Sequence, residues 1–278
     1  MIRLWVLAVP LAACNDIANP LYCDENSDCR NGTICNVDTH GCESVPSVDA
    51  MSDGVGPDGP YVARTVQEVR ASSTPVETFV ELTGVVVTAV DKYGPRTGEF
   101  WVQDSGGGPS SGIHIYGGIA TEVAALDVGD VVDIGNARKV TFTLGGDTTG
   151  RVEIELTPRI GGNLTIEKTG TGLPVHMDMD VSAIAALTQP QLDQEREKWA
   201  GMLVRVTLVR AEGPTETVTS VQQFSIGPFF VNDTETQLPS GIIAGTCFNE
   251  IIGIIEYARS YNVVPRQMAD ITIGAGCP

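Results

Sequence analysis

Residues 78–90 read TFVELTGVVVTAV, a run rich in β-branched side chains that decides the fold class of this chain. The run is long for a strand and contains Gly84, which inside a strand marks a bend or a bulge. Residues 99–104 (EFWVQD) and 112–116 (GIHIY) follow as two alternating stretches around a glycine-rich turn, the pattern of a β-hairpin. This part of the sequence therefore predicts a β domain.

Two further stretches complete that domain. Residues 128–135 (VGDVVDIG) and 152–157 (VEIELT) have the composition of strands, and residues 120–126 have that of a short helix. Five curved strands, with a glycine bend in the first and a helix after the third, are typical of the five-stranded OB barrel. The sequence predicts an OB-like barrel over residues 62–172 (domain 1).

A second copy of the pattern follows. Residues 199–209 (WAGMLVRVTLV) match the first long strand, and residues 229–233 (FFVND) match residues 100–104 (FWVQD). Two later stretches, residues 250–257 and 263–271, parallel the last two strands. Between the copies we expect a crossover with one short helix at residues 182–187, then a polar loop to Lys198. The prediction is all-β: two tandem OB-like barrels, the second over residues 173–278 (domain 2).

Four short motifs resemble a known region. They are Gly84-Val85-Val86, residues 100–104, Val128-Gly129-Asp130, and residues 197–206 (EKWAGMLVRV). Together they resemble the OB-like segments that precede the catalytic domain in secreted bacterial nucleases of the endonuclease/exonuclease/phosphatase class. The resemblance covers residues 62 to 273 and concerns the non-catalytic part of those enzymes, so it implies a binding region and no active site.

The first residues indicate export. Residues 1–13 have the charged start and apolar stretch of a signal peptide, and Leu11-Ala12-Ala13-Cys14 resembles a bacterial lipobox, in which the cysteine is acylated. We expect lipidation at Cys14 and a lipid anchor in the membrane; the alternative is an ordinary signal with an incidental cysteine. Asn15 is not the aspartate of inner-membrane retention, so the outer membrane is expected, on its periplasmic or its cell-surface face.

Cysteine usage agrees with an oxidising compartment. Residues 14–42 form a Cys-rich module with Cys23, Cys29, Cys35 and Cys42 among turn-forming residues. Two disulfides are expected there, with an interlaced pairing as one of three possibilities. Zinc is the rival interpretation, but the spacing lacks Cys-x2-Cys pairs, and the calcium-like Asp24-x-Asn26-x-Asp28 lacks the rest of a calcium loop.

Beyond the module, residues 43–61 are rich in Pro, Gly, Ser and Asp and have no apolar periodicity, so we expect an extended linker. The two remaining cysteines, Cys247 and Cys277, are expected to form a disulfide that ties the C-terminal tail to a late strand.

Composition excludes several classes of function. The 278 residues carry 17 Lys plus Arg against 35 Asp plus Glu, a net charge of −18, so binding driven mainly by phosphate neutralisation, as on duplex DNA, is excluded. No apolar run reaches the 18 or more residues of a spanning helix. The 42% of hydrophobic residues is enough for a folded core.

The sequence contains no pattern that indicates catalysis. Its three histidines, His40, His114 and His176, show no metal-ligand spacing. Residues 108–112 formally match G-x-S-x-G, but a nucleophile elbow joins a strand to a helix and this segment joins two strands. We therefore expect no enzyme activity, no cofactor and no metal site.

Binding is the remaining class, and OB barrels present their second and third strands and adjacent loops to ligands. If Phe100, Val102, Ile113 and Ile115 point inward, the intervening side chains point outward together. The candidate ligand face consists of Tyr93, Arg96, Trp101, Gln103, His114, Tyr116, Arg138 and Lys139. The alternative is that Trp101 and Tyr116 cover the barrel against its neighbour.

From these features we expect a non-catalytic, membrane-anchored lipoprotein that acts as a binding or scaffold module at the cell envelope. Its partner would be a protein, a glycan or a single-stranded nucleic acid, and not duplex DNA. The alternative function is an accessory subunit, binding nucleic acid or glycan, of an extracellular nuclease system.

Overall fold

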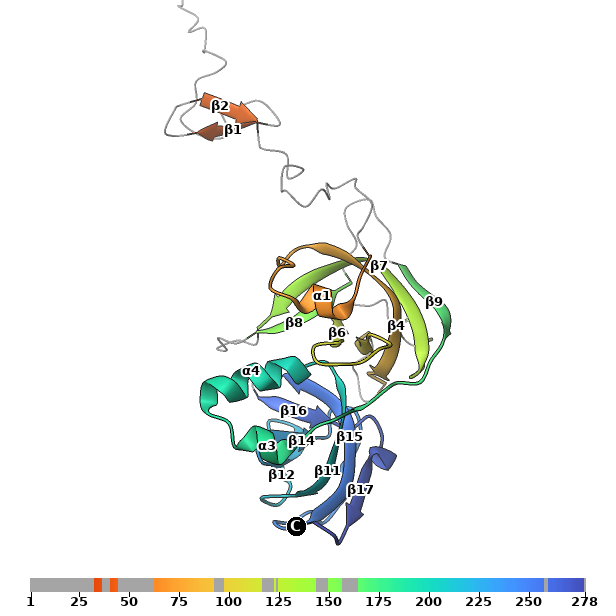
Figure 1. The fold of residues 1–278 in the computed structure, drawn as a ribbon, viewed down its shortest axis with the longest axis vertical. Coiled ribbons are helices and arrows are strands. Elements are labelled where there is room, and N and C mark those ends of the chain that lie inside the picture. Colours follow the sequence, from red (N-terminus) through yellow and green to blue (C-terminus); the bar gives the residue numbers. More distant parts are fainter. Residues whose placement is uncertain are drawn as a thin grey trace, which may run out of the picture. The chain divides into compact units, whose positions relative to one another are not determined.

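The computed structural model of this chain describes residues 33–36, 41–44, 63–92, 98–116, 123, 125–143, 150–156, 165–257 and 260–277. The chain divides into two compact units, residues 1–60 and 61–278. In the first unit, β1 (Thr33–Asn36) and β2 (Gly41–Ser44) form an antiparallel pair (Figure 1). The expected lipidation site Cys14, the cysteines Cys23 and Cys29, and residues 45–61 of the expected linker lie outside the described residues, whereas its first two residues, 43 and 44, belong to β2. None of the described helices is long and apolar enough to cross a membrane.

The first half of the second unit is a closed five-stranded barrel. Its strands are β4 (Phe79–Val90), β5 (Phe100–Gln103), β6 (Gly112–Tyr116), β7 (Asp130–Phe142) and β8 (Arg151–Glu155). They pair in the order β4-β5-β6-β8-β7, and β7 pairs back onto β4 to close the sheet. All these pairs are antiparallel except β6 with β8. This pairing is that of an OB-type Greek-key barrel, so the all-β prediction is confirmed.

The glycine bend in the first strand is also observed. Gly84 has φ +64, and the register of β4 against β7 shifts between Leu82 and Val85. The bend lets β4 pair with β5 at one end and with β7 along its length. Inside the barrel lies a core of alternating side chains from all five strands, including Leu82, Val85, Phe100, Val102, Ile113, Ile115, Val132, Ile134 and Ile154.

The second half repeats this arrangement. Its strands are β11 (Leu203–Arg210), β13 (Val221–Ile226), β14 (Phe229–Asn232), β15 (Cys247–Tyr257) and β16 (Tyr261–Val264). Their order is β11-β15-β16-β14-β13, and the pair β14 and β16 is parallel. β11 pairs with β10 and β15, while β13 pairs with β12 and β14. The second barrel therefore has the same strand order as the first but no ladder joining its first and second strands.

The elements that flank each barrel are repeated as well. A short strand pairs in parallel with the first barrel strand in both copies: β3 (Ala63–Arg64) and β10 (Met177–Asp178). A capped five-residue helix follows each, α1 (Val66–Arg70) and α3 (Val181–Ala185). An added strand on the fourth barrel strand ends each copy, namely β9 (Thr165–Thr171) and β17 (Ile271–Gly274). The remaining described elements are β12 (Glu216–Val218), α4 (Gln189–Trp199) and the 3₁₀ helix Met268–Asp270.

Three sequence-based expectations were wrong in detail. The polar loop expected before Lys198 is the helix α4, which starts with a capping box between Thr188 and Gln191 and carries Pro190 in its first turn. The helix α1 was not expected, although Thr65 and Glu68 form a capping box there too. Residues 229–233 were matched to the second strand of the first barrel, but β14 pairs in parallel with β16 and is therefore the third strand. The helix expected at residues 120–126 lies mostly outside the described residues.

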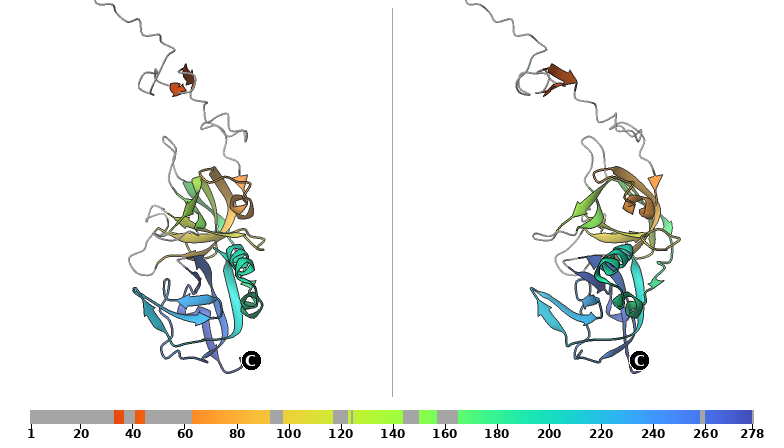
Figure 2. Two further views of the ribbon diagram at one scale, coloured as in Figure 1. Left: turned by 90° about the vertical axis from the view of Figure 1, so that its left-hand side faces the viewer. Right: turned by 60° about the vertical axis from the view of Figure 1, so that its left-hand side comes forward.

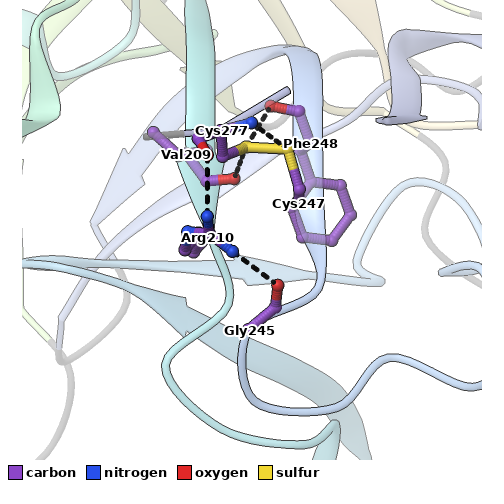
Figure 3. Close-up of a disulfide and its surroundings, with 6 residues drawn as sticks. All are labelled: Val209, Arg210, Gly245, Cys247, Phe248 and Cys277. Carbon is purple, nitrogen blue, oxygen red and sulfur yellow. Dashed lines mark hydrogen bonds between the residues drawn. A yellow bond between two sulfur atoms is a disulfide. The ribbon is translucent and has the colours of Figure 1, made fainter. Parts of the chain in front are cut away.

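A disulfide joins Cys247 to Cys277, as predicted (Figure 3). It links the start of β15 to the C-terminal segment that follows β17. The side chain of Arg210 reinforces the link, because its Nη2 donates to the Cys277 carbonyl oxygen at 2.7 Å. The core of this barrel contains the stacked rings of Phe224 and Phe248, whose centroids are 5.0 Å apart.

Candidate functional site

The hairpin β5–β6 positions the outward-facing side chains of the first barrel. Phe100, Val102, Ile113 and Ile115 lie in the core, so the period of two turns the intervening residues outward. Trp101 lies opposite His114 and Gln103 lies opposite Gly112. The structure therefore brings Trp101, Gln103, His114 and Tyr116 onto one face, which we name the β5–β6 face.

The second barrel lies on this face. Trp101 is 1% exposed and packs in a separate apolar cluster with Ala89 of β4 and with Leu203 and Ile254 of the second barrel. The two views of Figure 2 show the two barrels side by side, with the teal helix α4 at their junction. In this arrangement Trp101 is a packing residue between the barrels, because no part of its ring is open to a ligand.

Gln103 makes polar contacts between the barrels. Its side-chain oxygen accepts a hydrogen bond from the Leu203 amide at 3.2 Å, and its amide nitrogen donates to the Val175 carbonyl at 3.1 Å. Gln103 is 2% exposed. A buried amide whose donor and acceptor are both satisfied fixes the relative position of the two chain segments that it joins.

Two glycines allow the backbones of the two barrels to touch. A Cβ atom on Gly112 would lie 2.3 Å from the Gly201 carbonyl oxygen, and one on Gly201 would lie 2.8 Å from the Ile113 Cα. Gly201 also has φ +78, a conformation that glycine adopts without strain. The close contact therefore depends on both glycines.

Arg70, at the end of α1, inserts between the barrels. Its side chain is 5% exposed and donates to the Gly112 carbonyl at 2.9 Å, to Glu197 Oε1 at 2.8 Å, and to the carbonyls of Glu197 and Ala200. The last two carbonyls belong to the C-terminal end of α4, where a cation is electrostatically favoured. Tyr261 donates to the other oxygen of Glu197 at 3.0 Å. One guanidinium therefore joins α1 and β6 of the first barrel to α4.

His114 is the centre of a buried group of charges on the same face. Its Nδ1 lies 2.9 Å from Glu153 Oε2 and its Nε2 lies 3.0 Å from Glu99 Oε2. Arg151 donates to Glu153 at 2.8 Å and to Glu256 of the second barrel at 2.8 Å. Burial by itself lowers the pKa of His114, but the hydrogen bonds to Glu153 and Glu99 outweigh it, so this pKa lies above its usual value.

The other predicted face residues are placed differently. Tyr116 is 44% exposed and lies opposite Glu155 of β8. Arg138 of β7 lies on the other side of Glu155 and forms ion pairs with it and, at 2.7 Å, with Glu77. Lys139 points inward, is buried, and donates to the carbonyls of Ala71 and Thr74 at 3.0 and 2.6 Å. Tyr93 and Arg96 lie outside the described residues.

A recess lies at another part of the junction. It is lined by Val90, Lys92, Asp127 and Val128 of the first barrel and by Glu235 and Arg266 of the second. Lys92 pairs with Asp127 at 3.0 Å, and Arg266 donates to the Thr88 carbonyl at 3.1 Å and pairs with Asp270 at 2.9 Å. Its lining is thus already committed to ion pairs and to the contact between barrels.

The loop with the G-x-S-x-G pattern joins β5 to β6, as the hairpin prediction required. The Ser110 amide donates to the Lys198 carbonyl of α4 at 2.9 Å, so the loop is part of the contact between barrels. In the described part of the chain, no group of three or more His, Cys, Asp or Glu side chains is arranged to hold a metal ion.

Sequence reasoning found the outward residues of β5 and β6 but missed Arg70, Gly112, Gly201 and the pair Arg151–Glu153. The capping box at Thr65 and Glu68 would have revealed α1 and thus the position of Arg70 at its end. The glycines gave no local signal, because each is required by the other barrel.

No family model matches the chain, and no curated protein matches it in sequence. Among solved structures, it is similar to a chain in the structure titled "Structure and Conformational Change of a Replication Protein A Heterotrimer Bound to ssDNA", with 12% identity and a TM-score of 0.26. The match covers 73% of this chain and 50% of that one. The assignment of two OB-type barrels rests on the strand pairing described above.

Proposed function

We propose that this chain is a non-catalytic, membrane-anchored lipoprotein of the bacterial cell envelope, whose two-barrel body is a binding or scaffold module. Anchoring is inferred from Leu11-Ala12-Ala13-Cys14 and the polar linker that follows the Cys-rich module. The outer membrane is the proposed location.

One observation carries the scaffold role: the second barrel occupies the face through which an OB barrel usually contacts its ligand. Trp101 and His114 are 1% and 3% exposed, and their partners are residues of the second barrel or buried carboxylates. The two barrels therefore form one body, and partners must bind its outer surface. The equivalent strands of the second barrel, β13 and β14, keep Ser225 and Phe230 partly exposed.

The charge of the second barrel restricts the partner. From Ala211 to Tyr257 the chain contains no Lys, Arg or His. The same stretch contains six acidic residues: Glu212, Glu216, Asp233, Glu235, Glu250 and Glu256. Glu235 and Glu256 are buried, so four of these carboxylates are at least partly exposed. Nucleic-acid binding requires cations along the backbone path, so this stretch favours a protein or an uncharged glycan over single-stranded nucleic acid. Within the alternative of an accessory subunit in a nuclease system, glycan binding is then the better supported role.

Anchoring is tested by detergent phase separation of the full chain expressed in a bacterial host, with radiolabelled fatty acid. Wild type should enter the detergent phase and carry label, and Cys14→Ser should remain in the aqueous phase without label. Asn15→Gln is the matched control, because it leaves the thiol in place. Unlabelled wild type in the aqueous phase would contradict the proposal.

Binding is tested with the full-length Cys14→Ser variant on arrays of glycans and of single-stranded oligonucleotides at low salt. We expect signal from glycans or none from either array, and no signal from oligonucleotides. Salt-sensitive oligonucleotide binding would reverse the preference stated above. Incubation with nucleic-acid substrates and divalent cations should give no turnover.

A further inference from the structure

The indole nitrogen of Trp101 is a buried donor at the junction between the barrels. The residue is 1% exposed, and its Nε1 has no hydrogen-bond partner in the part of the chain that the structure describes. An indole nitrogen can only donate, so it needs an acceptor. A buried donor without an acceptor costs free energy, and native proteins satisfy such groups with protein atoms or with ordered water.

A small cavity lies beside the indole ring. The space in it that is open to the centre of a water-sized sphere is about 10 Å³. A buried water needs about 10–15 Å³ on this measure, so the cavity fits one water and no larger ligand. Cavities that stay dry are apolar. This one is lined by side chains with polar atoms, namely Trp101, His114 and Arg151 of the first barrel and Glu256 and Tyr257 of the second.

The side chains packed around Trp101 do not provide the acceptor. Its apolar cluster consists of Ala89, Leu203 and Ile254, whose side chains have no polar atoms. The ring nitrogens of His114 face Glu153 and Glu99 at 2.9 and 3.0 Å, so neither is open to the indole. Arg151 has donors only.

We infer that the cavity is a binding site for one water molecule, which accepts a hydrogen bond from Trp101 Nε1 and donates one to Glu256. Glu256 is 6% exposed, and its carboxylate accepts a hydrogen bond from Arg151 at 2.8 Å. An ionised carboxylate has about four acceptor positions, so Glu256 retains room for a water. Because Trp101 belongs to β5 and Glu256 to β15, this water joins the two barrels. A bridging water is nearly as favourable in enthalpy as a direct hydrogen bond.

NMR of the full-length Cys14→Ser variant, labelled with ¹⁵N-tryptophan, tests the site. The indole signals of Trp5, Trp101 and Trp199 are assigned with Trp5→Phe and Trp199→Phe. Cross-relaxation between each indole proton and water is measured in the laboratory frame and in the rotating frame. The sign in the rotating frame separates a bound water from chemical exchange of the indole proton itself.

We expect a cross-peak between the Trp101 indole proton and water, with the sign of cross-relaxation to a long-lived water in both frames. Trp199 is the internal comparison, because its Nε1 already donates to Glu195 at 3.2 Å. Tyr257→Phe is the control variant, since the hydroxyl proton of Tyr257 exchanges with water beside the same cavity, and the cross-peak should survive it. A crystal structure that resolves ordered waters should place one about 2.7–3.2 Å from Trp101 Nε1.

Four results would overturn the inference. They are the absence of the Trp101 cross-peak, an equally strong cross-peak at Trp199, loss of the Trp101 cross-peak in Tyr257→Phe, and electron density without a water at Nε1. The measurement on the chain with all three tryptophans decides the question even if one of the assignment variants does not fold.

Discussion

The two barrels have the same strand order, but their equivalent faces differ. Strand pairing aligns Trp101 and His114 of β5–β6 with Ser225 and Phe230 of β13–β14. The first pair is buried under the second barrel, whereas the second pair is partly exposed. A duplicated fold therefore does not carry a duplicated surface, and each copy has to be interpreted from its own residues.

The buried charges follow the same division. The alignment places Glu153 of the first barrel at the position of Asn262, and Lys139 at the position of Ile255. Burying a charge is unfavourable unless it has a partner. At these two aligned positions only the first barrel buries a charge, while the second barrel buries Glu256 and Asp270 at other positions. The predictions below test this difference, beginning with the largest effect.

Removal of Arg70, which joins the first barrel to α4, should have the largest effect on stability. We expect Arg70→Met to lower the free energy of unfolding by about 3–5 kcal/mol, because the carbonyls of Gly112, Glu197 and Ala200 all lose a charged donor and each such loss costs about 1–3 kcal/mol. Urea denaturation followed by tryptophan emission and far-ultraviolet circular dichroism measures it. The matched control is Arg205→Met, whose partner Asp178 is exposed. Equal losses in both variants would mean that Arg70 does not join the barrels.

Loss of the disulfide should act on the second barrel alone. Cys247 and Cys277 are 30 residues apart in sequence, and closing a loop of that length stabilises a fold by about 3.5 kcal/mol in the chain-entropy model. We expect the double variant Cys247→Ser/Cys277→Ser to lose amide protection in β11 and β15 but not in β4 and β7. Hydrogen exchange with mass spectrometry reads both barrels in one sample. Equal loss in both would indicate that the barrels unfold as one unit.

Local patterns in the sequence predicted most of the fold. The alternation in β5 and β6, the bend at Gly84 and the disulfide at Cys247 all depend on residues near one another in sequence or on one residue type. The helix α4 was missed because most of its residues are polar, and its apolar side chains Leu192 and Trp199 are only partly buried against the core of the second barrel. Its signals were the capping box and Pro190 in the first turn.

The contact between the barrels could not be predicted in the same way. The outward residues of β5 and β6 were identified correctly, but the sequence did not show whether Trp101 contacts a ligand or a second barrel. The contact between the barrels depends on the close approach of Gly112 and Gly201, which are 89 residues apart in sequence, and on the ion pair between Arg70 and Glu197. Such long-range pairs leave no periodicity and no local motif.

Replacement of Lys139 tests the buried charge of the first barrel. Its ammonium donates to the carbonyls of Ala71 and Thr74 and thereby holds the loop after α1. We expect Lys139→Met to cost about 1–3 kcal/mol, because those carbonyls lose a buried donor. The control is Lys92→Met, whose ammonium is half exposed. If Lys139→Met is as stable as wild type, an apolar residue serves here as well as Ile255 does in the second barrel.

The smallest predicted effect concerns the bend in the first strand of each barrel. Gly84 has φ +64, and the aligned Leu208 has φ +53. The second barrel therefore has a leucine in the left-handed conformation that favours glycine. A Cβ atom on Gly84 would meet no atom within 4 Å, and Leu208 is 50% exposed, so substitutions there change mainly the backbone energy.

We expect Gly84→Ala to lower the free energy of unfolding by roughly 1 kcal/mol, since left-handed backbone costs about 1–2 kcal/mol for residues with a Cβ. Leu208→Gly should raise it by less, because the relief of strain is offset by roughly 1 kcal/mol of added unfolded-state entropy. Thermal denaturation of the two variants measures both, and changes of the same sign would show that the two bends are not equivalent.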